Sequence, residues 1–147
     1  MNTAATTPVV YAGFWRRYAA LMVDGVLVLV AYSILIRLAL GLYGVDPAEL
    51  SAETRQLIET GAQAAFGFMY HWLMLHGMGA TLGKRALGVR VVDQSTMGAL
   101  SLGQAALRTF GTYISLLLFA IGYLMVVFDP QKRALHDRLA RTCVIRT

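Results

Sequence analysis

Residues 12–36 read AGFWRRYAALMVDGVLVLVAYSILI, and this stretch decides the fold class. From Tyr18 to Ile36 it is uncharged except for Asp24. At 1.5 Å per residue this run is about 28 Å long, close to the hydrocarbon thickness of a bilayer. It is too long for the core of a signal peptide, and no small-residue cleavage pattern follows it. We therefore predict a transmembrane helix that begins near Trp15.

The composition of the whole chain agrees with a membrane location. Of 147 residues, 57% are hydrophobic and only 14% are charged, and the mean hydropathy is +0.58. Soluble domains are about one quarter charged, so an ordinary soluble protein is excluded, as is a disordered chain. The single cysteine, Cys143, excludes an intrachain disulfide.

Two further uncharged runs, Gly61–Met78 and Thr109–Phe128, predict more membrane segments. The third run has two interpretations, because residues 102–128 suffice for one crossing or for a bent, re-entrant hairpin. We expect an all-α integral membrane protein with three to four membrane helical segments. Residues 10–146 form its single domain, after a flexible tail at 1–9.

Smaller elements are predicted between and after these runs. Asp46-Pro47-Ala48-Glu49 has the pattern of a helix start, which indicates a short surface helix before the second span. Val89–Val92 is β-branched and is followed by a turn at 93–98, a weak hairpin signal, and Thr142–Ile145 offers another strand. These segments predict a small cytoplasmic β-hairpin-like element.

Charge predicts the orientation of the chain. The first loop holds four acids (Asp46, Glu49, Glu53 and Glu59), whereas most of the 13 Lys and Arg lie elsewhere. Two segments are strongly basic: Lys84, Arg85, Arg90 and Arg108 in the second loop, and Lys132, Arg133, Arg138, Arg141 and Arg146 in the tail. Because positive loops stay in the cytoplasm, we expect a cytoplasmic N-terminus. A bent third segment would return the tail to the cytoplasm, and a simple third crossing would place it outside.

Asp24 is the most informative polar residue, because a carboxylate within a membrane helix costs at least ~2.5–3.5 kcal/mol to insert. Arg17 lies on the same helix face, but its side chain leans away toward the N-terminus, so a direct pair is not expected. Arg108, inside an otherwise apolar stretch, is the best candidate partner, with Lys84 or Arg85 as alternatives. Asp24 is either a structural ion-pair partner or a carboxylate that exchanges protons with a cation.

Other chemistry has little support. His71 and His76 are five residues apart and do not share a helix face, so no metal site and no cofactor are predicted. His136-Asp137 reads as a hydrogen-bonded turn, with catalysis on a lipid headgroup as a minor alternative, and we expect no enzyme. No aromatic-interleaved basic patch indicates nucleic-acid binding.

The chain resembles the RDD family of small bacterial membrane proteins, named for one arginine and two aspartates. The likeness is carried by Ala12-Gly13-Phe14-Trp15-Arg16-Arg17 with Asp24-Gly25, by residues 79–93 (GATLGKRALGVRVVD), and by Phe128-Asp129-Pro130 with His136-Asp137-Arg138-Leu139-Ala140. It implies that Arg17 or Arg16 and Asp24 are the first two signature residues, and that Asp137, or else Asp129, is the third. Arg141 departs from the pattern, since the family often has glycine there.

The resemblance also implies a set of site residues. The signature and polar network comprises Arg16, Arg17, Asp24, Arg108, Asp129, His136 and Asp137, and the central motif contributes Thr81, Gly83, Lys84, Arg85 and Gly88. Some relatives are proposed to exchange Na⁺, Li⁺ or K⁺ for protons, which would make Asp24 the exchange site. The alternative is a non-catalytic assembly or adaptor module that presents its basic loop and tail to a partner or to anionic lipid. We expect a multi-pass protein of the bacterial inner membrane, as a homo-oligomer or an accessory to a larger complex.

Overall fold

The computed structural model describes residues 9–44, 46–117 and 121–147. Its elements are α1 (Phe14–Tyr43), a 3₁₀ turn η1 (Pro47–Glu49), α2 (Ala52–Met78), α3 (Leu82–Ala86), β1 (Val89–Asp93), α4 (Leu102–Leu117), α5 (Ile121–Phe128), α6 (Leu135–Leu139) and β2 (Thr142–Arg146). Except for Val9, the tail predicted at residues 1–9 lies outside the described residues.

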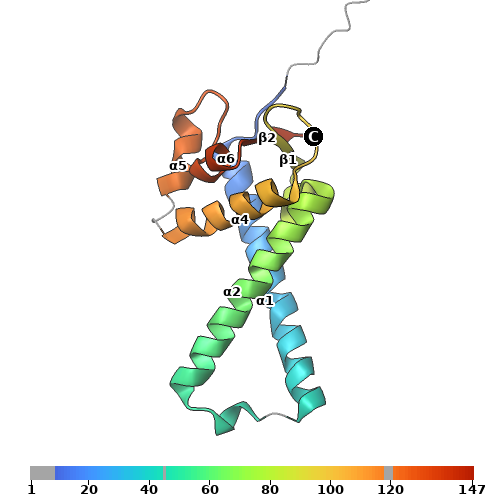
Figure 1. Cartoon of the computed structure of the whole chain (residues 1–147), viewed down its shortest axis with the longest axis vertical. Coiled ribbons are helices and arrows are strands. Elements are labelled where there is room, and N and C mark those ends of the chain that lie inside the picture. The colour runs from blue at the N-terminus through green and yellow to red at the C-terminus, as the bar shows by residue number, and fades with distance from the viewer. Residues whose placement is uncertain (1–8, 45, 118–120) are drawn as a thin grey trace, which may run out of the picture.

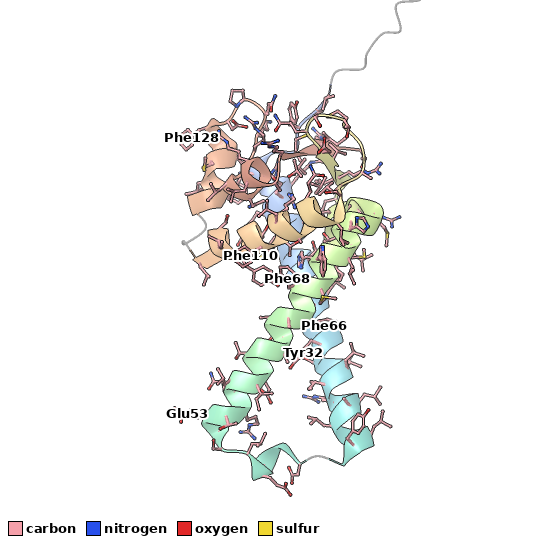
Figure 2. The ribbon with its side chains drawn as sticks, in the orientation of Figure 1. Tyr32, Glu53, Phe66, Phe68, Phe110 and Phe128 are labelled. Atoms are coloured by element: carbon pink, nitrogen blue, oxygen red, sulfur yellow. The ribbon has the colours of Figure 1, made fainter. Side chains whose placement is uncertain are left out.

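Two long helices, α1 and α2, cross near their middles and diverge toward the loop that joins them (Figure 1). Near the crossing, the rings of Tyr32 and Phe66 lie 6.0 Å apart, centre to centre (Figure 2). By length and composition, α1 is the one helix within the described ranges that could cross a membrane. The helix α2 is long enough but less apolar, so the number of membrane spans stays a prediction.

The helix α2 starts earlier than predicted. Its N-terminus is capped by Ser51, whose hydroxyl accepts a hydrogen bond of 3.2 Å from the Thr54 N–H. The expected start at Gly61 therefore lies inside the helix. The predicted surface helix is only the turn η1, where Asp46 Oδ1 accepts from the Ala48 N–H at 2.8 Å. The helix ends at Met78 and is capped by Gly79, whose φ of +66° favours glycine.

The apolar stretch 102–128 forms two helices rather than one. The first, α4, lies across α1 and α2, and α5 returns beside α6 (Figure 1). Residues 118–120, between them, lie outside the description. This arrangement agrees with the bent alternative for the third segment.

The fold is mostly helical rather than all-α, because β1 and β2 form an antiparallel sheet. Val91 opposes Val144 in its register. The pairing is not the hairpin expected from the turn at 93–98, since the second strand comes from the C-terminus. The side chains of Val89, Val91 and Val144 pack with Leu75 in the buried core.

The strands lie with three short helices at one end of the α1–α2 pair. We call this end the cap and define it as residues 81–100 and 121–146. The opposite end, residues 34–60, contains the loop with η1 and is called the far end (Figure 1). The two ends are structurally distinct, because α3 and α5 of the cap pack against α1, whereas the far end consists of the diverging ends of α1 and α2 with the loop between them.

Candidate functional site

Asp24 is fully buried on the face of α1 that packs against α3. Its carboxylate accepts hydrogen bonds from the hydroxyl of Tyr70 at 2.8 Å, the hydroxyl of Thr81 at 2.5 Å and the N–H of Gly83 at 2.8 Å. The Nζ atom of Lys84 lies 3.9 Å from Asp24 Oδ2. Asp24 therefore joins α1 to α2 and to the start of α3. We call these residues the Asp24 cluster.

Gly83 is required for the close approach of α3 to α1. A Cβ atom at this position would lie 2.5 Å from the carbonyl oxygen of Ala20 and 2.9 Å from Cγ of Asp24. Lys84 follows and is 7% exposed, and its ammonium donates to the Thr81 hydroxyl at 3.3 Å. The pKa of Lys84 is lowered to about 8, mainly by burial and to a lesser extent by repulsion from Arg108.

Asp137 is the centre of a second buried cluster, formed by α1, α4 and α6. Its carboxylate forms ion pairs with the guanidinium groups of Arg17 and of Arg108, the latter through two hydrogen bonds of 2.7 and 3.1 Å. It also accepts from the Ala134 N–H at 2.9 Å. Burial alone would raise the pKa of Asp137, but Arg108 and Arg17 hold it below its usual value. We call this group the Asp137 cluster.

The two clusters correct one prediction and confirm another. Arg108, expected to pair with Asp24, binds Asp137 instead, and the cation nearest Asp24 is Lys84. The other alternative, Arg85, is exposed, and its side chain contacts the sulfur of Met78. The expectation that Arg17 would not pair directly with Asp24 is confirmed, because its guanidinium is held by Asp137 and by the Lys132 carbonyl.

His136, beside Asp137, is buried at 1% exposure. Burial lowers its pKa to about 3, although the neighbouring Asp137 opposes that shift. The imidazole is therefore neutral at pH 7. Gly111 of α4 makes room for it, since a Cβ there would lie 3.0 Å from Cβ of His136. His136 and Asp137 are buried parts of the helix packing.

The other predicted residues lie around these clusters. Asp129 accepts from Arg133 at 3.0 Å and from Arg138 at 2.7 Å, so it is an outer ion-pair site that does not contact Arg17. Its hydrogen bond with Arg133 is the main reason that its pKa is lowered. Arg16 is exposed and donates to the Leu87 carbonyl at 3.2 Å. Gly88 has a φ of +61° at the turn before β1.

Sequence reasoning missed Tyr70 as a partner of Asp24. Its hydroxyl donates to Asp24 and accepts from the Leu82 N–H at 3.0 Å, which links α2 to α3. No residue pattern indicates this role directly, because Tyr70 lies in an aromatic run typical of membrane helices. Within the described ranges, no three His, Cys, Asp or Glu side chains are arranged to hold a metal ion.

Comparison with known proteins identifies a matching family model and two similar proteins. The family model described as "RDD family" matches residues 11–141. The chain is 30% identical to the uncharacterized protein YxaI of Bacillus subtilis, over 91% of this chain and 96% of that protein. It is 39% identical to the uncharacterized protein RP437 of Rickettsia prowazekii, over 47% of this chain and 38% of that protein. No solved structure matches significantly. The family match and the apolar helix α1 together indicate a membrane protein, and the chain belongs to the RDD family.

Proposed function

We propose that this chain is a non-catalytic membrane assembly module whose cap binds anionic lipid headgroups. The observation that carries this proposal is the charge on the surface of the cap. Its exposed charged side chains are all cationic: Arg85, Arg90, Lys132, Arg138, Arg141 and Arg146. The acids of the cap, Asp93, Asp129 and Asp137, are buried. The internal ion pairs thus leave the outer face of the cap positive.

The far end has the opposite character. Asp46, Glu49, Glu53 and Glu59 are exposed there, with only Arg37 and Arg55 as cations. Figure 2 labels Glu53 at the start of α2, far from the cap. Under the positive-inside rule the cap is cytoplasmic, where anionic lipids attract basic segments with about 1 kcal/mol per Lys or Arg.

Two exposed aromatic side chains, one beside the cap and one within it, support contact with the membrane surface. Trp15 is 77% exposed at the start of α1, and Phe128 is 86% exposed at the end of α5 (Figure 2). Large aromatic side chains are typical of the interface between headgroups and hydrocarbon. We infer that these side chains place the cap at headgroup level in the bacterial inner membrane, with α1 in the hydrocarbon.

Lipid selectivity tests this proposal directly. The chain is placed in nanodiscs of mixed zwitterionic and anionic phospholipid, and the lipids retained after release are counted by native mass spectrometry. We expect enrichment of anionic lipid that falls in the double variant Arg90→Gln/Arg146→Gln. The matched control is Arg37→Gln/Arg55→Gln, which removes the same charge from the far end. Equal retention by both double variants, or no enrichment in the unmodified chain, contradicts the proposal.

The assembly role requires a second copy or another protein, and copurification distinguishes them. A stoichiometric partner that stays bound through mild solubilisation supports an accessory of a larger complex. A homo-oligomer supports self-assembly. A monomer in nanodiscs of native lipid composition, with no partner in any preparation, contradicts the assembly role and leaves only lipid binding.

A second candidate function, exchange of Na⁺, Li⁺ or K⁺ for protons at Asp24, is favoured by the position of Lys84. Its ammonium is the nearest cation to Asp24, and its pKa near 8 allows loss of a proton close to neutral pH. A monovalent cation could then take its place, with the hydroxyl oxygens of Tyr70 and Thr81 as ligands. In acid-loaded vesicles with a lumenal pH dye, cation-driven alkalinisation that disappears in Asp24→Asn supports exchange, and a flat trace from inserted protein refutes it.

A further inference from the structure

A cavity of about 360 Å³ lies between α1, α2 and α4. This volume lies within the range of about 300–1,000 Å³ that is typical of small-ligand sites. Most of its wall is apolar and includes Leu21, Val28, Leu75 and Leu116. Its rim includes the exposed residue Gly25 of α1, so a ligand could enter from the side of the helices.

The wall of this cavity also includes two buried cations. Lys84 and Arg108 are 7% and 3% exposed, and both line the cavity. They belong to the Asp24 and Asp137 clusters, so they form the cap side of the cavity. An anionic group that reached this side would meet two positive charges in a site of low polarity, where charge interactions are strong.

The buried charges of the two clusters do not cancel. With Lys84 protonated, as it mostly is at pH 7, Asp24 and Asp137 supply two negative charges, whereas Arg17, Lys84 and Arg108 supply three positive charges. A buried charge without a counter-ion is costly. Because two of the three cations lie on the cavity wall, the uncompensated positive charge is next to the cavity.

The remaining buried acids do not remove this excess. Asp129 is paired with Arg133 and Arg138 at the outside of the cap. Asp93 accepts hydrogen bonds from Ser95 and Thr96 in the turn after β1 and does not line the cavity. One negative charge is therefore missing at the cavity.

His71 provides a second, independent observation. Its Nδ1 atom is 2.8 Å from the carbonyl oxygen of Gly67, so Nδ1–H donates to that oxygen. Its Nε2 atom is buried and has no hydrogen-bond partner among the described residues. His71 lines the cavity together with the two cations. This nitrogen is an acceptor, so a water between it and a carboxylate in the cavity would satisfy it by donating one O–H to each.

We propose that this cavity binds an anionic amphiphile with a single alkyl chain and a carboxylate head. The head lies toward Lys84, Arg108 and His71, and the alkyl chain lies along the apolar wall formed by α1, α2 and α4. One negative charge matches the buried excess of one positive charge. The cavity volume suits one short chain rather than the two chains of a phospholipid. This site is separate from the outer face of the cap, so it does not rest on the proposed lipid surface.

The test compares three ligands with equal alkyl chains. The unmodified protein, in nanodiscs of zwitterionic lipid, is titrated with decanoate, decanol or decyltrimethylammonium while its Tm is measured. We expect decanoate to raise Tm and to saturate at one molecule per chain in native mass spectra, whereas the neutral and cationic analogues give no saturable shift. An equal shift with decanol, or no shift with decanoate, overturns the proposal.

A pair of glycine variants locates the site. Gly25 lines the cavity and has no atom within 4 Å of the position of an added Cβ, so Gly25→Leu can place its side chain in the cavity without a clash at Cβ. Gly41→Leu is the matched control, since Gly41 has equal space in the same helix but does not line the cavity. We expect at least a tenfold weaker apparent affinity for decanoate in Gly25→Leu and an unchanged affinity in Gly41→Leu. Full affinity in folded Gly25→Leu places the binding elsewhere, such as on the basic cap, and overturns the proposal.

Discussion

Asp24 and Asp137 are both fully buried carboxylates beside α1, yet their partners differ in kind. Asp24 is held mainly by hydroxyl groups and a backbone N–H, with an ammonium 3.9 Å away. Asp137 is held by two guanidinium groups. A hydroxyl can donate or accept a hydrogen bond, whereas a guanidinium can only donate and keeps its charge. The Asp24 cluster can therefore adapt to a change of charge, and the Asp137 cluster cannot.

This difference separates the roles of the two signature positions. The Asp137 cluster joins three segments that are far apart in sequence, since Arg17 is 120 residues before Asp137 and Arg108 is 29 residues before it. It fixes the cap to α1. The Asp24 cluster adds α2 and α3 to the same helix, but leaves its cation only loosely paired. Of the two clusters, the Asp24 cluster is therefore the one that can gain or lose a charge while the protein works.

The largest effect is expected from neutralising the two carboxylates separately. Asp137→Asn leaves Arg17 and Arg108 buried without a counter-ion, which should cost about 3–5 kcal/mol of unfolding free energy. Asp24→Asn should cost about 1–3 kcal/mol, because the hydroxyls of Tyr70 and Thr81 can reorient. Denaturant unfolding of the two variants in the same lipid and detergent mixture checks the order. Equal losses would remove the distinction between the clusters.

A steric substitution sharpens the comparison on the Asp24 side. Gly83→Ala adds a Cβ 2.5 Å from the carbonyl oxygen of Ala20, so α3 must move away from α1. We expect a loss of about 1–3 kcal/mol or more from overpacking. The control is Gly103→Ala in α4, where no atom lies within 4 Å of the added Cβ. A Tm for Gly83→Ala as high as that of the control would show that α3 does not pack as described.

The pH dependence of stability tests the burial of His136, which lies beside Asp137. The folded state keeps His136 neutral down to about pH 3, whereas the unfolded chain takes up a proton near pH 6.5. Between these values the unfolded state binds more protons, so the stability falls as the pH falls, by about 1.4 kcal/mol per pH unit at most. His136→Gln should flatten this slope between pH 6.5 and pH 4.5 in thermal unfolding. An unchanged slope would assign the acid sensitivity to other groups.

The smallest expected effect is a gain in stability at the turn between α6 and β2. Arg141 has a φ of +51°, a conformation in which glycine is more stable than other residues. The family resemblance, which has glycine at this position, agrees with that backbone. Arg141→Gly should therefore raise the unfolding free energy by about 0.5–1 kcal/mol. Arg138→Gly, one helix turn earlier in α6, is the contrasting variant, and a gain there as well would argue against a local backbone cause.

Several elements followed from the sequence because local patterns determine them. The apolar run around Asp24 predicted α1, and the β-branched residues at 89–92 and 142–145 predicted both strands. The start of α2 was missed because Ser51 caps a helix whose first turns are polar. Patterns of apolar residues do not detect such a helix.

Pairings between distant residues did not follow from the sequence. Arg108 was recognised as a buried cation that needs a carboxylate, but its position gives no preference between Asp24 and Asp137. Only the packing of α4 against α6 decides that choice. The role of Tyr70 depends in the same way on the crossing of α1 and α2. A single sequence indicates that a buried charged residue needs a partner, but it does not identify that partner.

Hydrogen–deuterium exchange at the backbone amides of the cap tests most directly whether Asp137 fixes the cap to α1. The unmodified chain, Asp24→Asn and Asp137→Asn are compared in identical nanodiscs. We predict that Asp137→Asn speeds exchange in α6 and β2 by roughly 10²- to 5 × 10³-fold, as a loss of about 3–5 kcal/mol requires, with the far end unchanged. Unchanged protection of α6 and β2 in folded Asp137→Asn would contradict a structural role for this cluster.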